Sequence, residues 1–127
     1  MKKKLVVILG GTFDPVHLGH LQVADFAFKR LAADIGWFMP CGLHADKDPE
    51  QVSSSVHRTA MLKLVLKNLA QWSLQDFELK TKKPTYTLET VQALHKLYPE
   101  YQFAYLMGQD VIETITSWDD WQKILDF

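Results

Sequence analysis

The fold is decided by one stretch near the start of the chain, Leu5-Val6-Val7-Ile8-Leu9 followed directly by Gly10-Gly11-Thr12-Phe13-Asp14-Pro15-Val16-His17-Leu18-Gly19-His20. A continuous apolar run rich in β-branched residues is typical of a central parallel strand that is buried on both faces. The segment that begins at Leu18 has the spacing of an amphipathic helix. The stretch therefore predicts the first strand-to-helix turn of an α/β domain, and ligands bind where such turns lie, at the carboxyl ends of parallel strands.

The residues of this turn are suited to a phosphate ligand. Gly10 and Gly11 let the backbone approach a ligand closely, and they tolerate φ/ψ values that other residues avoid. His17 and His20 fall on the same side of the first helical turn, whose free N–H groups and dipole favour anions. A metal pair would need further ligands, and the sequence has no nearby cysteine and no His-Glu-x-x-His pattern. The turn therefore predicts a polyphosphate site, with a plain helix start that carries two incidental histidines as the alternative.

The rest of the chain alternates between strand and helix patterns, which predicts a Rossmann-like, doubly wound parallel sheet of the α/β class. With the first strand central, the expected strand order is 3-2-1-4, and residues 10–20 then face residues 108–110 across one crevice. The expected later strands are 35–39, 72–79 and 101–107. The expected helices are 18–33, one capped by Ser55, and one that begins at Thr85 or Thr87 and stops before Pro99.

Length and composition predict one ordinary globular domain over residues 1–127, because the chain has 47% hydrophobic residues and a formal net charge of −1. No basic excess points to nucleic acid, and no apolar run approaches the roughly 18 residues needed to cross a membrane. The single cysteine, Cys41, cannot form an internal disulfide, which favours a cytoplasmic location.

Residues 10–20 resemble the signature of the nucleotidyltransferase superfamily, whose core is His-x-Gly-His and stands here as His17-Leu18-Gly19-His20. Within the superfamily, the chain is most similar to the bacterial nicotinate-nucleotide adenylyltransferases. That closer resemblance rests on Pro84-Thr85-Tyr86-Thr87, Leu106-Met107-Gly108-Gln109-Asp110 and Ser117-Trp118, and it extends from the first strand to Phe127.

The resemblance implies an enzyme of NAD biosynthesis that transfers AMP from ATP to nicotinate mononucleotide. The 5′-phosphate of nicotinate mononucleotide would attack the α-phosphorus of ATP, which releases pyrophosphate and forms deamido-NAD. His17 and His20 would be the catalytic pair that stabilises charge on the triphosphate, and Mg²⁺ would be bound through the ATP phosphates, without metal ligands from the protein. The implied ATP-binding residues are Gly10, Gly11, Thr12, Phe13, His17, His20 and Lys47.

The implied nicotinate mononucleotide site lies in the second half of the chain. Asp110 follows a strand end, where a carboxylate can accept hydrogen bonds from ribose hydroxyls, although such an aspartate also caps helices. Trp118 can stack on the pyridine ring, with core packing as its alternative. A helix start at residues 85–87 offers N–H donors to a carboxylate, which favours nicotinate over nicotinamide. The implied residues are Thr85, Tyr86, Thr87, Gly108, Asp110 and Trp118.

The chain departs from the family pattern at two places. In the loop from Cys41 to Ser55, Asp46 stands where the family has a histidine; Lys47 keeps a basic residue for the phosphate tail, and Arg58 is a second candidate. The second superfamily motif, Ile-Ser-x-Thr-x-x-Arg, does not occur. We therefore expect a C-terminally incomplete domain that lacks the last parallel strand. We also expect homo-oligomers through the exposed edge of strand 103–107, which a monodisperse monomer in sedimentation would contradict.

The sequence leaves two alternative functions open. One is an adenylyltransferase with another phosphate acceptor, such as nicotinamide mononucleotide or phosphopantetheine, because the His-x-Gly-His core is common to the superfamily. The other is a non-catalytic nucleotide-binding fragment, because the second phosphate-binding motif is absent. Acceptor comparison separates the first alternative from the main prediction, and pyrophosphate release separates the second.

Overall fold

The computed structural model describes residues 3–11, 13, 16–40, 55–80 and 87–106. Within these ranges strands and helices alternate along the chain, as the sequence predicts. The strands are β1 (Lys4–Gly11), β2 (Ile35–Pro40), β3 (Trp72–Leu74) and β4 (Tyr101–Leu106). The helices are α1 (Leu18–Arg30), α2 (Ser55–Leu66) and α3 (Thr87–Leu97), with a short 3₁₀ helix, η2 (Phe77–Lys80).

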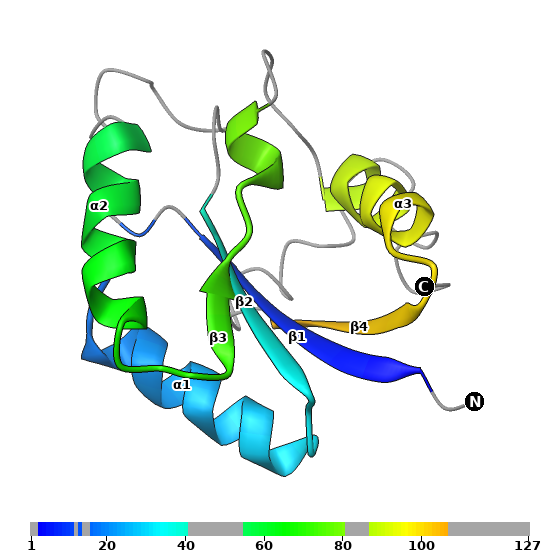
Figure 1. Cartoon of the computed structure of the whole chain (residues 1–127), viewed down its shortest axis with the longest axis horizontal. Helices are drawn as coiled ribbons and strands as arrows, with labels where there is room; N and C mark the ends of the chain where they lie inside the picture. The colour runs from blue at the N-terminus through cyan, green and yellow to red at the C-terminus, as the bar shows by residue number, and fades with distance from the viewer. Residues whose placement is uncertain (1–2, 12, 14–15, 41–54, 81–86, 107–127) are drawn as a thin grey trace, which may run out of the picture.

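The strands form one parallel sheet in the order β3-β2-β1-β4, which confirms the predicted order. β1 is central, and its residue Leu9 is aligned with Phe38 of β2 and Leu106 of β4. The carboxyl ends of these strands therefore meet at one edge of the sheet, where Gly11 lies beside Pro40. This edge carries the turn from β1 into α1 (Figure 1).

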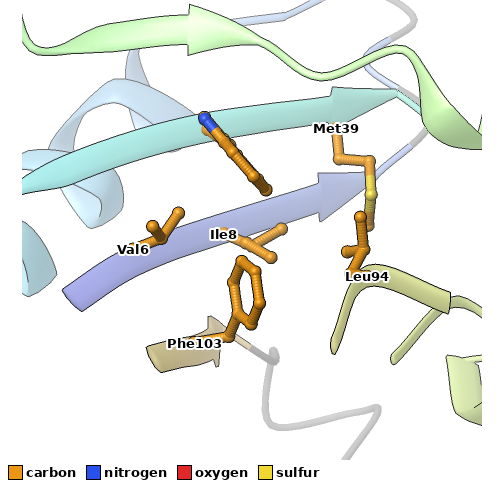
Figure 2. Close-up of a cluster of buried hydrophobic side chains, with 6 residues drawn as sticks. Val6, Ile8, Met39, Leu94 and Phe103 are labelled. Carbon is orange, nitrogen blue, oxygen red and sulfur yellow. The ribbon is translucent and has the colours of Figure 1, made fainter. Parts of the chain in front are cut away.

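Helices cover both faces of the sheet, with α1 and α2 on one side and α3 on the other (Figure 1). Successive side chains of a strand point to opposite faces, and β1 supplies both cores in this way. Figure 2 shows the cluster on the α3 side, which contains Val6, Ile8, Trp37, Met39, Leu94 and Phe103. The cluster on the α1 and α2 side contains Leu9, Phe13, Ala24, Phe38 and Leu62. Burial on both faces is why the sequence of β1 is continuously apolar.

The predicted third strand over 72–79 is wrong in its second half. Among the described strands β3 pairs only with β2, and that pairing ends at Leu74, which is aligned with Phe38. The N–H of Gln75 donates to the carbonyl of Phe38 at 2.9 Å, and the side-chain Oε1 of Gln75 accepts from the N–H of Phe77 at 3.2 Å. These two bonds turn the chain into η2, and no second strand of the described sheet lies beside β3 to keep it extended.

Helix α1 ends at Arg30, before the predicted end at residue 33. Ala32 has a φ of 51°, the left-handed conformation that often stops a helix. The N–H of Ala33 donates to the carbonyl of Phe28 at 3.0 Å, and that of Ala32 donates to the carbonyl of Lys29 at 3.2 Å. This pair of bonds is a Schellman motif, here with an alanine in the place usually taken by glycine.

Gly36 in β2 is required by the packing of Trp72. A Cβ atom at position 36 would overlap the Trp72 ring, which packs directly over the backbone of β2. Gly36→Ala is therefore expected to lower the free energy of unfolding by about 1–3 kcal/mol, the usual effect of overpacking. Urea unfolding measures the change, and Trp72→Leu in the same chain should recover part of the loss. Equal losses in both backgrounds would show that Trp72 is not the cause.

Among the described helices, none has the length and apolar character that crossing a membrane requires. β4 is the outermost strand on its side of the described sheet. Self-association along β4 stays a prediction.

Candidate functional site

The predicted polyphosphate turn joins the end of β1 to the start of α1. His17 is the N-cap of α1, with extended backbone angles (φ −142°, ψ 176°). Its carbonyl accepts the N–H of His20 at 3.0 Å and that of Leu21 at 3.3 Å, which are the first hydrogen bonds of the helix. The first amides of a helix have no partner within it and point away from its N-terminus. The turn thus presents an anion-favouring helix start at the carboxyl edge of the sheet.

The two predicted histidines lie against each other. Their rings stack with centroids 3.8 Å apart and an interplanar angle of 21°. The backbone N–H of His17 donates to Nδ1 of His20 at 3.1 Å. A ring nitrogen that accepts a hydrogen bond carries no proton, so the proton of neutral His20 is on Nε2. His20 is therefore fixed as an Nε2–H donor, the form that can bind a phosphate oxygen.

The environment of His20 favours its neutral form. Partial burial lowers the pKa of His20 below the ordinary value of 6.5, and the neighbouring His17 lowers it further. The pKa of His95 on α3 is also lowered, by burial and then by Lys3. Both shifts favour the neutral imidazole near neutral pH.

These two lowered pKa values predict how stability depends on pH. Below about pH 6.5 the unfolded chain binds protons that the folded chain resists, so the free energy of unfolding should fall as the pH drops from about 7.5 to 5.5. Urea unfolding at several pH values measures the slope. His20→Gln and His95→Gln should each make the curve flatter in this window. A stability that rises on acidification would contradict the neutral assignment.

Phe13 lies beneath the turn. Its side chain is 2% exposed, and its ring meets the ring of His20 edge-on, with centroids 4.9 Å apart at 75°. The same ring meets Phe38 of β2 at 5.5 Å. A contact between Phe13 and a ligand would therefore have to go through the backbone.

The glycines of the turn matter for the room that they leave for neighbouring atoms, and not for unusual backbone angles. None of the described glycines has a positive φ, so Gly10 and Gly11 do not use the conformational freedom that glycine has. A Cβ atom on Gly11 would touch the Phe13 ring at 3.4 Å, and one on Gly10 would lie 3.7 Å from the carbonyl oxygen of Met39. At Gly11, the space that a Cβ atom would take lies next to the buried Phe13 ring. Close approach of the glycine backbone to a ligand stays a prediction.

Gly19 leaves room for the ring of His17. A Cβ atom at position 19 would lie 2.9 Å from Cε1 and 3.0 Å from Nδ1 of that ring. Gly19→Ala should displace the His17 ring from His20 while keeping or raising stability, because alanine is the better helix former by about 1 kcal/mol. We expect ATP to bind at least about tenfold more weakly, measured by calorimetry beside a thermal unfolding curve. Unchanged affinity would mean that the position of the His17 ring does not matter.

The other predicted site residues fall in two groups. Thr87 is the first residue of α3. β4, which leads toward residues 108–110, ends with Leu106 beside Leu9 at the carboxyl edge. Outside the described residues lie Thr12, Lys47, Thr85, Tyr86, Gly108, Asp110 and Trp118.

Sequence reasoning missed the burial of Arg58. This arginine of α2 is 3% exposed, so it is not a solvated surface cation. Its role as a candidate for the phosphate tail stays a prediction. Arg58 lies four residues before the fully buried Leu62, so the two side chains share one helix face. This four-residue spacing is the sequence pattern that could have predicted the burial of Arg58. Within the described ranges, no three His, Cys, Asp or Glu side chains gather as metal ligands would.

The parallel sheet with helices on both faces, and the strand-to-helix turn at its carboxyl edge, define a Rossmann-like α/β protein. A family model described as cytidylyltransferase-like matches residues 8–127. The chain belongs to the cytidylyltransferase-like family.

Individual relatives agree with this assignment. The chain is similar to a nicotinate-nucleotide adenylyltransferase from Bacillus subtilis, with 36% identity over 123 residues, 97% of this chain and 65% of the relative. It is 38% identical, over 119 residues, to a protein from Bacillus licheniformis that is named a probable nicotinate-nucleotide adenylyltransferase, covering 94% of this chain and 63% of the relative. The chain therefore spans less than two thirds of the length of these relatives.

A solved structure has the same fold. It is the Plasmodium falciparum nicotinic acid mononucleotide adenylyltransferase complexed with NaAD, with a TM-score of 0.82 and 27% sequence identity. The match covers 95% of this chain and 60% of that one. The likeness thus extends over nearly all of this chain.

Proposed function

We propose that this chain carries the ATP-binding part of a nicotinate-nucleotide adenylyltransferase, which transfers AMP from ATP to nicotinate mononucleotide in NAD biosynthesis. The observation that carries the proposal is the stacked pair of His17 and His20 at the start of α1, in which His20 is fixed as an Nε2–H donor. Relatives named for this activity, and a solved relative bound to NaAD, support it.

In this proposal, the turn binds the triphosphate. The free N–H groups at the start of α1 and the Nε2–H of His20 donate to phosphate oxygens, with His17 stacked beside it. An oxygen of the nicotinate mononucleotide phosphate bonds to the α-phosphorus of ATP, the α–β bridging P–O bond breaks, and pyrophosphate leaves with the electron pair. The histidines stabilise the negative charge that develops, which requires their position but no covalent step.

The proposed metal ion is Mg²⁺, bound through the phosphates of ATP. The described groups of the turn are imidazoles and backbone N–H groups, whereas Mg²⁺ prefers carboxylate and phosphate oxygens. This donor set fits an ion that is brought in by the triphosphate. When bound, the ion neutralises part of the phosphate charge.

The proposed acceptor site uses the residues that follow β4 and those at the start of α3. Gly108, Asp110 and Trp118 would bind the nucleoside and its pyridine ring, and Thr85, Tyr86 and Thr87 would bind the nicotinate carboxylate. The alignment of Leu106 with Leu9 supports this arrangement, because it places the end of β4 at the edge that holds His17 and His20. Thr12 and Lys47 would complete the ATP site.

Three further predictions of the sequence stay proposals. Residues 1–127 would belong to one nucleotidyltransferase domain, the single cysteine favours a cytoplasmic location, and nucleic acid is not an expected partner.

Pyrophosphate release tests the proposed function. The chain is mixed with ATP, Mg²⁺ and one acceptor at a time: nicotinate mononucleotide, nicotinamide mononucleotide or phosphopantetheine. We expect release with nicotinate mononucleotide to exceed the other two. Faster release with another acceptor would overturn the proposed acceptor, and ATP binding without any release would favour the non-catalytic fragment.

A further inference from the structure

Phe13 has a backbone conformation that aromatic residues rarely adopt. Its φ is 51°, in the left-handed region that is sparsely populated by bulky residues. Such a conformation persists only where the surrounding structure holds it in place, and it is concentrated at functional sites. Phe13 lies in the chain between the end of β1 and the two histidines, and its backbone conformation decides where its ring packs against His20.

Two ring contacts hold the Phe13 ring in one place. Phe38 meets it at 5.5 Å and 62°, and His20 meets it at 4.9 Å and 75°. Gly11 leaves room for the ring, because a Cβ atom there would lie 3.4 Å from it. The ring is 2% exposed and belongs to the buried cluster on the α1 and α2 side. The Phe13 ring therefore packs between Phe38 of the sheet core and the imidazole of His20, and it fixes the position of the imidazole relative to that core.

His20 is held from several directions at once. His17 stacks on its ring, the backbone N–H of His17 binds Nδ1, and Phe13 meets the ring edge-on. The hydrogen bond fixes the tautomer, but an imidazole can still rotate about a single hydrogen bond. The two ring contacts restrict that rotation, so together they decide where Nε2–H points.

We infer that Phe13 is a positioning residue for His20, and that it orients the imidazole so that Nε2–H meets a phosphate oxygen of a bound nucleoside triphosphate. This inference rests on the proposed function and deepens it. In this inference, the aromatic ring of Phe13 contacts His20 and does not contact the ligand. A residue that acts in this way should affect triphosphate affinity beyond its effect on stability.

Phe38 supplies a matched control. It is a fully buried ring of the same cluster, and it contacts Phe13 and Trp72. Phe13→Leu and Phe38→Leu each replace one buried ring of this cluster by an aliphatic side chain. Only the first of them removes a ring that touches His20 in the structure.

The experiment compares the two variants with the unaltered chain by three measurements. These are thermal unfolding, the pKa of the His20 ring by NMR, and the dissociation constant for ATP with Mg²⁺ by calorimetry. With both variants folded, we expect Phe13→Leu to move the pKa of His20 toward 6.5 and to weaken ATP binding by roughly tenfold. Phe38→Leu should leave the pKa of His20 unchanged at a comparable loss of thermal stability. If Phe13→Leu does not fold, Phe13→Met takes its place.

Equal changes in the pKa of His20 and in ATP affinity for the two variants would overturn the inference, because Phe13 would then be an ordinary core residue. A double variant adds a second test: in the His20→Ala background, Phe13→Leu should weaken ATP binding by less than twofold. A full tenfold effect there would show that Phe13 acts without His20. If His20→Ala itself leaves ATP binding unchanged, the proposed function fails, whereas the pKa measurement still tests the position of His20.

Discussion

His20→Ala is expected to slow pyrophosphate release from ATP and nicotinate mononucleotide by about 10²–10³-fold, the usual effect of removing one preorganised donor to developing charge. The structure gives the reason. The Nδ1 atom of His20 accepts a hydrogen bond from the N–H of His17, which leaves Nε2–H as the donor for the proposed triphosphate. Alanine removes that donor while the first backbone hydrogen bonds of α1, accepted by the carbonyl of His17, are kept.

His57→Ala is the matched control for this variant. His57 is an exposed histidine of α2, and it is not part of the proposed site. Its replacement should leave the rate within about twofold, because His57 is not part of the proposed site. The protein should also stay folded, since exposed substitutions usually change stability by no more than about 0.5 kcal/mol. Turnover that persists unchanged in His20→Ala would overturn the assignment of the site.

Phe38→Ala is expected to lower the free energy of unfolding by about 3–5 kcal/mol, because it empties a large space in a closed core. Phe38 is fully buried in β2, where its ring contacts the rings of Phe13 and Trp72. A domain of this size has roughly 5–15 kcal/mol in total, so the loss would be a large part of its stability. Urea unfolding measures it directly.

Phe26→Ala is the control for Phe38→Ala, because it makes the same chemical change at an exposed position. The Phe26 side chain is 71% exposed on the outer surface of α1. Its replacement should change the free energy of unfolding by no more than about 0.5 kcal/mol. Similar losses for the two variants would mean that β2 does not form the core described above.

Much of the fold could be predicted from local patterns. The apolar run of β1 indicates burial on both faces, and the alternation of elements then leaves few topologies, which is why the order β3-β2-β1-β4 was correct. The ends of elements were harder. β3 stops at Leu74 because Gln75 bonds to Phe38 and Phe77, and α1 stops at a left-handed Ala32. Both stops depend on bonds between residues whose types do not signal a turn.

The sequence identified the histidine pair but not its arrangement. Spacing places His17 and His20 on one side of a helix, yet the stacking of their rings and the hydrogen bond to Nδ1 are three-dimensional facts. The sequence also predicted Phe13 as an ATP-binding residue, which stays a prediction, but it did not show that the Phe13 ring is buried against His20. The burial of Arg58 could have been predicted because it shares a helix face with the buried Leu62. It was missed because a charged residue is usually expected at the surface.

A nucleoside triphosphate is expected to bind at His17 and His20. The most direct measurement is the NMR spectrum of the imidazole nitrogens as ATP and Mg²⁺ are added, because the chain has five histidines that report separately. We expect the signals of His17 and His20 to shift with added ATP, while those of His57 and His95 stay in place. Saturable binding of ATP that leaves the signals of His17 and His20 unmoved would contradict this account.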